Sequence, residues 1–208
     1  MAPRPNPAPV GHERQLARAR AGEAGALGQL LDGYRHYLTL LAELQLDRAM
    51  RAKVGVSDVV QETFLDALRD FGRFRGETPA EFASWLRQVL ARNLVNQIRQ
   101  YRGTRRRDVR LEQELVAAVG ESSACVGACL IAPADSPGRQ ADRHEAAVRL
   151  ADALARLPPD YRDVLVLRYL HELSFPEVAD RMGRTLDSVK KLWVRGLIKL
   201  RALMPEPI

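Results

Sequence analysis

The apolar positions of this chain repeat every three or four residues, which is the spacing of amphipathic helices. Residues 1–22 begin with a proline-rich stretch and are expected to form a disordered tail. A helix ending near Leu44 follows. Its apolar face is formed by Leu27, Leu30, Leu31, Tyr34, Leu38 and Leu41. Other helices must complete the core.

Two further helices show the same pattern. One is expected from Ser57, a good N-cap with Asp58 in the first turn, to about Phe71. Its predicted buried face consists of Val60, Thr63, Phe64, Ala67, Leu68 and Phe71. The other begins with a capping box of Thr78 and Glu81 and ends near Arg102. Its core candidates are Phe82, Trp85, Leu86, Val89, Leu90 and Leu94.

The exposed sides of these two helices differ in character. The first presents a polar face around one leucine, formed by Asp58, Gln61, Glu62, Leu65, Asp66 and Arg69. Such a face fits either a docking surface or an ordinary solvated helix. The second presents cations and amides, namely Arg87, Arg92, Asn93, Asn96, Arg99 and Arg102, near Phe71, Phe74 and Trp85. That mixture suits unstacked bases and phosphates, unless the aromatics are core and the arginines merely solvated.

The pattern weakens after residue 103. Glycines and prolines interrupt residues 104–141, which are therefore predicted to be a flexible linker with a short helix at 111–119. Helical spacing resumes in residues 142–204, where Pro158-Pro159 ends one helix and another precedes residue 174. The predicted fold is all-α, with two small helical domains, 23–103 and 142–204, joined by the linker.

Residues 174–203 of the second domain are predicted to form a helix, a turn that contains a glycine, and a second, basic helix. Ser174 and Glu177 form a capping box, Pro176 lies in the first turn, and Gly183 permits the turn. The second helix, from about Leu186 to Leu203, buries Val189, Trp193, Gly196, Leu197, Leu200 and Leu203. Its other side presents Arg184, Ser188, Lys190, Lys191, Arg195 and Lys199. This is the pattern of a helix-turn-helix that reads DNA, the alternative being a solvated basic helix.

Composition and charge limit the range of possible functions. The 208 residues are 46% hydrophobic but 6% aromatic, as in a helical protein with aliphatic cores. No apolar run could span a membrane and no signal peptide is evident, so we expect a cytoplasmic protein with no stable membrane association. The net charge is +6, and residues 72–110 hold ten arginines against three acids. This second basic region indicates another contact with nucleic acid.

Catalysis and cofactor binding are not expected. Cys125 and Cys129 form an isolated C-x3-C pair, too few ligands for zinc unless His144 and another group join, and unpaired thiols are the preferred interpretation. The histidines are scattered, and no nucleophile–base pair or phosphate-binding loop is evident. The sequence therefore predicts a protein that is not an enzyme and has no cofactor or metal.

In this order, the motifs resemble those of bacterial sigma factors of the extracytoplasmic-function group, over about residues 23–203. The segment Asp58-Val-Val-Gln-Glu-Thr-Phe64 is similar to the D-x-x-Q-E-x-F signature of that family. The other matching segments are Phe74-Arg-Gly76, Phe82-Ala-Ser-Trp-Leu86, Arg92-Asn93, Leu157-Pro158, Arg168-Tyr-Leu and the helix-turn-helix through Arg201. Leu192, Trp193 and the long linker depart from the family pattern.

The resemblance implies a sigma factor that binds core RNA polymerase and directs promoter-specific initiation. Core-polymerase binding would fall to Asp58, Gln61, Glu62, Leu65 and Asp66. The promoter −10 element would be bound by Phe74, Arg75, Trp85, Arg92, Asn93, Asn96 and Arg99. The −35 element would be read by Arg184, Thr185, Ser188, Lys190, Lys191 and Arg195. The implied partners are core RNA polymerase, promoter DNA and an anti-sigma protein. The alternative is a stand-alone helix-turn-helix regulator of duplex DNA.

Overall fold

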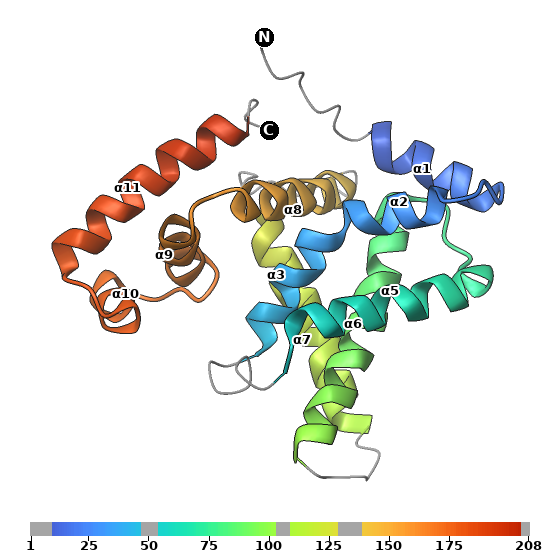
Figure 1. Cartoon of the computed structure of the whole chain (residues 1–208), viewed down its shortest axis with the longest axis horizontal. Coiled ribbons are helices and arrows are strands. Elements are labelled where there is room, and N and C mark those ends of the chain that lie inside the picture. The colour runs from blue at the N-terminus through green and yellow to red at the C-terminus, as the bar shows by residue number, and fades with distance from the viewer. Residues whose placement is uncertain (1–9, 47–53, 103–108, 129–138, 205–208) are drawn as a thin grey trace. The chain divides into compact units, whose positions relative to one another are not determined.

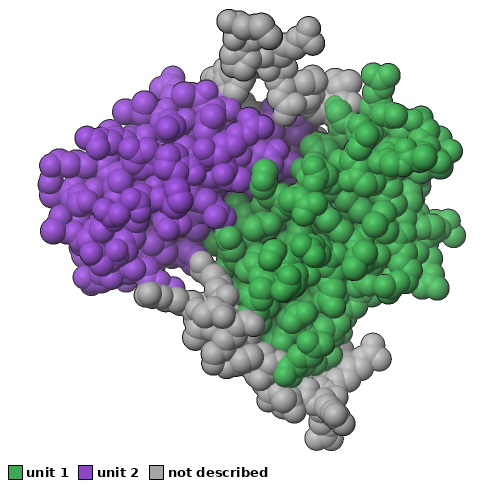
Figure 2. Space-filling model, in the orientation of Figure 1, with its two compact units in different colours: residues 1–121 green, residues 122–208 purple. Residues whose placement is uncertain are grey.

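The computed structural model describes residues 10–46, 54–102, 109–128 and 139–204. The described residues contain helices and no strand, which confirms the all-α prediction (Figure 1). They divide into two compact units, residues 1–121 and 122–208, called unit 1 and unit 2 below (Figure 2).

Unit 1 is built from the helices of the N-terminal half of the chain. Its elements are α1 (Val10–Arg20), α2 (Ala26–Gly33), α3 (Arg35–Gln45), α5 (Val56–Asp70), a 3-10 turn (Phe71–Arg73), α6 (Pro79–Arg102) and the first part of α7 (Val109–Ala128). Helix α5 packs against both α3 and α6. Its core contains leucines at the predicted spacing, together with valines, alanines, Tyr34, Tyr37 and the fully buried Phe82. The unit therefore presents one side of α5 to solvent.

The helix predicted to end near Leu44 is in fact two helices. Helix α2 closes at Tyr34, whose backbone N–H donates to the Leu31 carbonyl at 3.0 Å. The buried Tyr34 side chain donates a hydrogen bond from its hydroxyl to the Pro79 carbonyl at 3.3 Å. Its ring also lies 5.5 Å from that of Phe82, centroid to centroid. The break thus places an aromatic side chain between the start of α6 and the rest of the core.

The expectation of a disordered tail over residues 1–22 is wrong from Val10 onward. Helix α1 occupies Val10–Arg20 and packs against α2. It buries Leu16 and Ala19, whose apolar surface stabilises the helix in its packed position. The prolines that suggested disorder all precede this helix, and residues 1–9 lie outside the described part of the chain.

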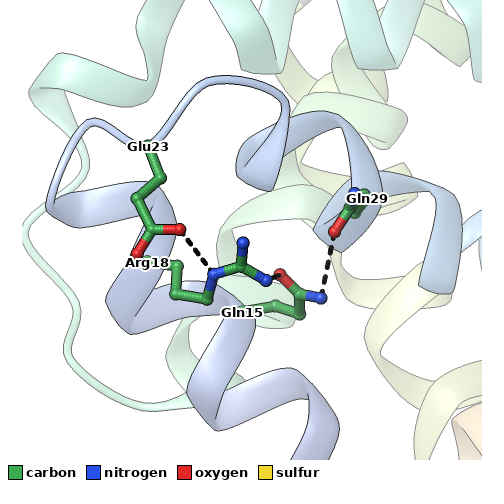
Figure 3. A network of polar contacts seen from close by, with 4 residues as sticks. All are labelled: Gln15, Arg18, Glu23 and Gln29. Carbon is green, nitrogen blue, oxygen red and sulfur yellow. Dashed lines mark hydrogen bonds and ion pairs between the residues drawn. The ribbon is translucent and has the colours of Figure 1, made fainter.

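Polar side chains join α1 to the turn that follows it and to α2 (Figure 3). Arg18 Nε donates to Glu23 Oε2 at 2.6 Å, and its Nη1 donates to Gln15 Oε1 at 3.4 Å. Gln15 Nε2 in turn donates to Gln29 Oε1 at 3.1 Å. The His12 ring lies 4.9 Å from the Tyr34 ring. These contacts attach α1 along its length.

The N-cap of helix α5 lies two residues before the predicted N-cap, Ser57. Its N-cap is Gly55, whose carbonyl accepts from the backbone N–H groups of Asp58 and Val59. Ser57 lies inside the helix instead. Asp58 is in the first turn as expected, where the helix dipole favours a carboxylate.

The predicted linker contains a longer helix than expected. Residues 109–128 form α7, in place of the short helix at 111–119. In unit 1, α7 buries Leu115 and Val119, and Gln45 Nε2 donates to the Ala118 carbonyl at 3.4 Å. Tertiary contacts thus support a segment whose glycine and serine content argued for flexibility. Residues 103–108 and 129–138, with Cys129, lie outside the described part of the chain.

Unit 2 contains the remainder of α7 and the helices α8 (Arg139–Ala155), α9 (Pro159–Tyr169), α10 (Phe175–Met182) and α11 (Leu186–Leu203). Helix α11 packs against α9, α10 and α8. Gly196 allows the close approach of α11 to α9, because a Cβ there would lie 3.3 Å from the Tyr161 carbonyl oxygen and 3.4 Å from Leu165. This packing leaves the N-terminal turn of α11 accessible.

Candidate protein- and DNA-binding surfaces

One exposed side of α5 combines apolar and acidic groups. Asp58, Gln61 and Glu62 are exposed as predicted, and Leu65 is 59% exposed. Leu68, predicted to be buried, is 49% exposed and lies one turn beyond Leu65. We call Asp58, Gln61, Glu62, Leu65 and Leu68 the α5 face. Exposed leucines with a polar rim are typical of a surface that a protein partner covers.

Two acidic side chains at the edge of the α5 face already have partners, one on α6 and one on α5 itself. Glu62 Oε2 accepts from Gln97 Nε2 of α6 at 3.3 Å. Asp66 is half-buried and pairs with Arg69 at 3.0 Å. Asp66 is thus less available to a partner than the other predicted docking residues. Phe64, assigned to the core, is half-buried with the Arg35 guanidinium 4.9 Å from its ring centroid.

Four aromatic side chains form a cluster that joins the segment after α5 to the start of α6. Phe71 and Phe74 come from that segment and Phe82 and Trp85 from α6, and we call the four the aromatic cluster. The Phe74 ring lies 6.1 Å from Phe71, 5.5 Å from Phe82 and 5.2 Å from Trp85. Phe82 is fully buried, whereas Phe71, Phe74 and Trp85 are half-buried. The partly exposed rings provide flat apolar surfaces of the kind on which bases stack.

Gly76 allows Phe74 to occupy this position. A Cβ on residue 76 would lie 2.5 Å from Phe74 Cζ and 2.8 Å from Glu81 Cβ. The Phe-Arg-Gly segment found in the sequence therefore has a steric basis. Its arginine, Arg75, is exposed beside the cluster.

The polar residues predicted on α6 separate into exposed and buried positions. Arg92 and Asn96 are exposed, and Arg99 is half-buried. Asn93 was expected to project from the surface, but it is only 3% exposed. Its Nδ2 donates to Thr63 Oγ1 at 3.3 Å, and that hydroxyl donates to the Val59 carbonyl at 2.8 Å. Helical spacing alone did not reveal that α5 covers this side of α6.

In unit 2 the helix-turn-helix forms as predicted. Ser174 and Glu177 make the capping box, and the Ser174 backbone N–H donates to Glu177 Oε2 at 2.7 Å. Gly183 adopts the left-handed conformation, with φ of 62°. Thr185 caps α11 by accepting from the Ser188 backbone N–H at 3.3 Å. The capped start of α11 is thereby fixed relative to α10.

The predicted DNA-contacting residues lie on the exposed side of this helix start. Arg184, Thr185, Lys190, Lys191 and Arg195 are exposed and Ser188 is half-buried. Arg184 Nη2 lies 2.7 Å from Asp160 Oδ2 of α9, and Lys191 Nζ lies 2.6 Å from Asp187 Oδ2. No pattern in the sequence points to Asp160, because only the fold brings α9 to the turn.

Trp193 has a structural role, as its spacing indicated. Its Nε1 donates to the Tyr169 hydroxyl at 3.3 Å, and its ring meets Phe175 edge-on at 5.4 Å. Arg168 lies 5.3 Å from the Phe175 ring centroid. These contacts hold α9, α10 and α11 together.

Within the described residues, no group of three or more histidine, cysteine or acidic side chains is placed to hold a metal ion. Nor is any described helix both long and apolar enough to cross a membrane. Cys125 is half-buried, and its Sγ lies 4.0 Å from the Tyr169 carbonyl oxygen. The candidate binding surfaces described above are the α5 face, the aromatic cluster and the start of α11.

Comparison with known proteins shows the family to which this chain belongs. Residues 34–104 match the family described as Sigma-70 region 2, and residues 147–200 match Sigma-70, region 4. RNA polymerase sigma factor CarQ of Myxococcus xanthus is 30% identical over 162 residues, which cover 77% of this chain and 81% of CarQ. The chain is thus a member of the sigma-70 family.

The group within that family follows from further relatives. ECF RNA polymerase sigma factor BldN of Streptomyces coelicolor is 32% identical over 192 residues, which cover 92% of this chain and 65% of BldN. A solved structure of an RsbN–BldN complex is 26% identical, covers 90% of this chain and 98% of that chain, and superposes with a TM-score of only 0.31. This chain belongs to the extracytoplasmic-function sigma factors.

Proposed function

We propose that this chain binds core RNA polymerase in the cytoplasm and directs it to promoters by contacting DNA with both of its units. The observation that supports this most strongly is that one chain contains both region 2 and region 4. Each region has an exposed surface suited to the binding that we propose for it. No catalytic chemistry is needed for this role.

The α5 face is proposed to dock on core polymerase. Leu65 and Leu68 supply apolar area that water covers in the free protein, and Asp58, Gln61 and Glu62 supply hydrogen-bond acceptors and charge around it. Asp66 belongs to the rim, where it is already paired with Arg69. Its removal is therefore expected to matter less than that of Leu65.

The aromatic cluster and the exposed side of α6 are proposed to hold the −10 element after its strands separate. Separation loses base stacking, which costs a few kcal/mol per step, so the opened strand needs surfaces that replace the lost contacts. Phe74 and Trp85 offer ring faces, while Arg75, Arg92, Asn96 and Arg99 offer donors to phosphates and bases. Asn93 is better assigned to the core.

The start of α11 is proposed to enter the major groove at the −35 element. A capped, basic helix N-terminus presents donors to base edges and phosphates in the manner of other helix-turn-helix proteins. The contacting set is Arg184, Thr185, Ser188, Lys190, Lys191 and Arg195. Each good bidentate base contact contributes about 1–3 kcal/mol of discrimination.

Regulation by an anti-sigma protein is the third partnership that the family suggests. Such a partner would need to cover surfaces that polymerase or DNA otherwise binds. The α5 face, the aromatic cluster with the exposed side of α6, and the start of α11 are the candidates in the described part of the chain. A competition binding assay between an anti-sigma candidate and core polymerase would test this.

The proposal is tested by promoter-directed transcription in vitro with sigma-free core polymerase and the DNA upstream of the gene. Wild-type protein should be captured by core and should initiate at one defined start. Leu65→Ser and the Asp58→Ala, Gln61→Ala double variant should lose capture while retaining their circular dichroism. Val116→Ser is the matched control, because Val116 is also exposed, at 39%, but lies on α7.

The outcomes separate the two functions considered. Capture by core that only the α5 variants lose supports the sigma assignment and this docking surface. No capture at low salt, together with a footprint of the protein alone on duplex DNA, would instead favour a stand-alone regulator.

A further inference from the structure

The DNA-binding side of unit 2 contains a carboxylate that the proposed function does not use. Asp160 lies in the first turn of α9, where the helix dipole stabilises its charge. Its Oδ2 is 2.7 Å from Nη2 of Arg184, one of the proposed −35 contacts. The pair therefore joins the start of α9 to the turn of the helix-turn-helix.

The backbone around Arg184 is fixed, so only its side chain can change partner. Gly183 on one side has a left-handed conformation and Thr185 on the other caps α11. The Arg184 backbone N–H itself donates to the Ala179 carbonyl at 3.0 Å. Rotation of side-chain torsions is thus the available way for the guanidinium to leave Asp160.

The pair is exposed enough to exchange. The side chains of Arg184 and Asp160 are 39% and 51% exposed. Ion pairs at such positions contribute little, because water and salt screen them and two side chains must be ordered. A phosphate oxygen is a strong competing acceptor for a guanidinium. Asp160 cannot accompany Arg184 onto DNA without bringing two anions close together.

We propose that Asp160 restrains Arg184 in the DNA-free protein and that binding replaces the carboxylate by a DNA phosphate, so that Asp160 lowers the affinity of the helix-turn-helix for DNA. This rests on the proposed function of the α11 start. Lys191 and Asp187, 2.6 Å apart on α11, show the same charge pairing within one helix. Asp160 differs from Asp187 because it lies on another helix, α9, and pairs with a residue of the turn.

The size of the effect follows from the exposure of the pair. Replacing Asp160 by asparagine removes the competing charge, and an exposed pair corresponds to a change in affinity of about 1.4- to 5-fold. Binding should also become more sensitive to salt, because in the wild type the carboxylate freed by DNA takes up a counterion, whereas asparagine does not. Asp160→Glu keeps the charge and should behave like the wild type.

The experiment measures binding of the reconstituted holoenzyme to a labelled duplex from its promoter, by fluorescence anisotropy at several salt concentrations and at low temperature. It compares wild type, Asp160→Asn, Asp160→Glu, Arg184→Ala and the double variant Asp160→Asn, Arg184→Ala. Asp180→Asn is the charge-matched control, since Asp180 is exposed on α10. Thermal unfolding of each variant checks its fold.

The proposal expects Asp160→Asn to bind more tightly, Arg184→Ala to bind more weakly, and the gain to disappear in the double variant. An equal gain in the Arg184→Ala background, or an equal gain in Asp180→Asn, would show a general charge effect and overturn it. Weaker binding by Asp160→Asn would mean that Asp160 orients Arg184 toward DNA, which also overturns it. If Arg184→Ala is neutral, the proposed DNA-contacting role of Arg184 fails as well.

Discussion

Asn93 shows how burial decides what a single polar side chain can do. On α6 it lies beside Arg92, yet Arg92 is exposed and Asn93 is buried. Its amide donates to Thr63 Oγ1, which joins α6 to the buried side of α5. A side chain held in this way supports the surface formed by the two helices and does not itself reach a ligand.

Asn93→Ala should therefore destabilise the protein. The substitution removes a hydrogen bond within the core and leaves a small cavity, with an expected loss of about 1–3 kcal/mol in the free energy of unfolding. Urea unfolding followed by circular dichroism measures it. Asn96→Ala is the matched control, because Asn96 is exposed on the same helix. A stable Asn93→Ala protein that fails only in DNA binding would return Asn93 to the DNA-contacting set.

At residue 76 the absence of a side chain is the important feature. Gly76→Ala places a methyl group where Phe74 Cζ would be 2.5 Å away, so the Phe74 ring must move. We expect a loss of about 1–3 kcal/mol in stability, as for other overpacked sites, and reduced promoter opening.

The control for this substitution is Gly72→Ala, because a Cβ at residue 72 meets nothing within 4 Å. Urea unfolding and permanganate footprinting of the opened promoter measure the two effects. If Gly76→Ala and Gly72→Ala behave alike in both assays, the close contact with Phe74 affects neither stability nor promoter opening.

At the scale of elements, local sequence signals specified the helix starts most reliably where a capping box was present. Thr78 with Glu81 and Ser174 with Glu177 both form the expected reciprocal bonds. Backbone N–H groups of Glu77 and Thr78 donate to the Glu81 carboxylate and lower its pKa below the ordinary 4.5. The Ser174 side chain, and then its backbone N–H, lower the pKa of Glu177 in the same way.

These lowered pKa values predict a pH dependence with a definite sign. Glu177 in the folded protein has a pKa below its ordinary value of 4.5, so its contribution to stability is fully present above pH 4.5. The contribution is lost as the pH falls through the lower, folded-state pKa. The difference in stability between the wild type and Glu177→Gln should therefore stay constant from pH 7 down to about pH 4.5 and shrink at lower pH.

Chemical unfolding at intervals from about pH 7 to pH 3, together with NMR titration of the Glu177 carboxyl carbon, measures this effect. Glu172→Gln is a suitable control, because Glu172 is an exposed acid in the loop before α10. A difference between wild type and Glu177→Gln that stays constant across the whole range would contradict the role of the carboxylate.

At the scale of the whole molecule, the chain contains two units with separate sets of buried side chains. Leu16 in α1 and Leu165 in α9 are 1% and 3% exposed, one in each unit. Leu16→Ala and Leu165→Ala should each cost about 2–5 kcal/mol, because both remove buried methyl groups and leave cavities. We expect each substitution to increase hydrogen exchange chiefly in its own unit, as measured by mass spectrometry of peptides.

The pair of substitutions also tests whether α1 is part of the fold. If Leu16→Ala left exchange in unit 1 unchanged, α1 would not be a structural part of that unit. If either substitution raised exchange equally throughout both units, the chain would unfold as one cooperative body.

The sequence alone predicted the all-α fold, the helix-turn-helix and most of the exposed α5 face. These features depend on helical spacing, capping residues and turn glycines, all of which act over a few neighbouring residues. The family assignment likewise followed from short motifs in a fixed order, and the region 2 and region 4 matches confirm it. The boundaries of the two domains remain a prediction.

Tertiary structure decided what neighbouring residues could not. The packing of α5 on α6 buried Asn93 and left Leu68 exposed, and contacts with α2 ordered α1 despite the prolines before it. Likewise, Asp160 and Arg184 are 24 residues apart in sequence, and they meet only because α9 packs beside the turn. In each case the deciding contact comes from a segment distant in the chain, and periodicity within one helix gives no information about such a segment.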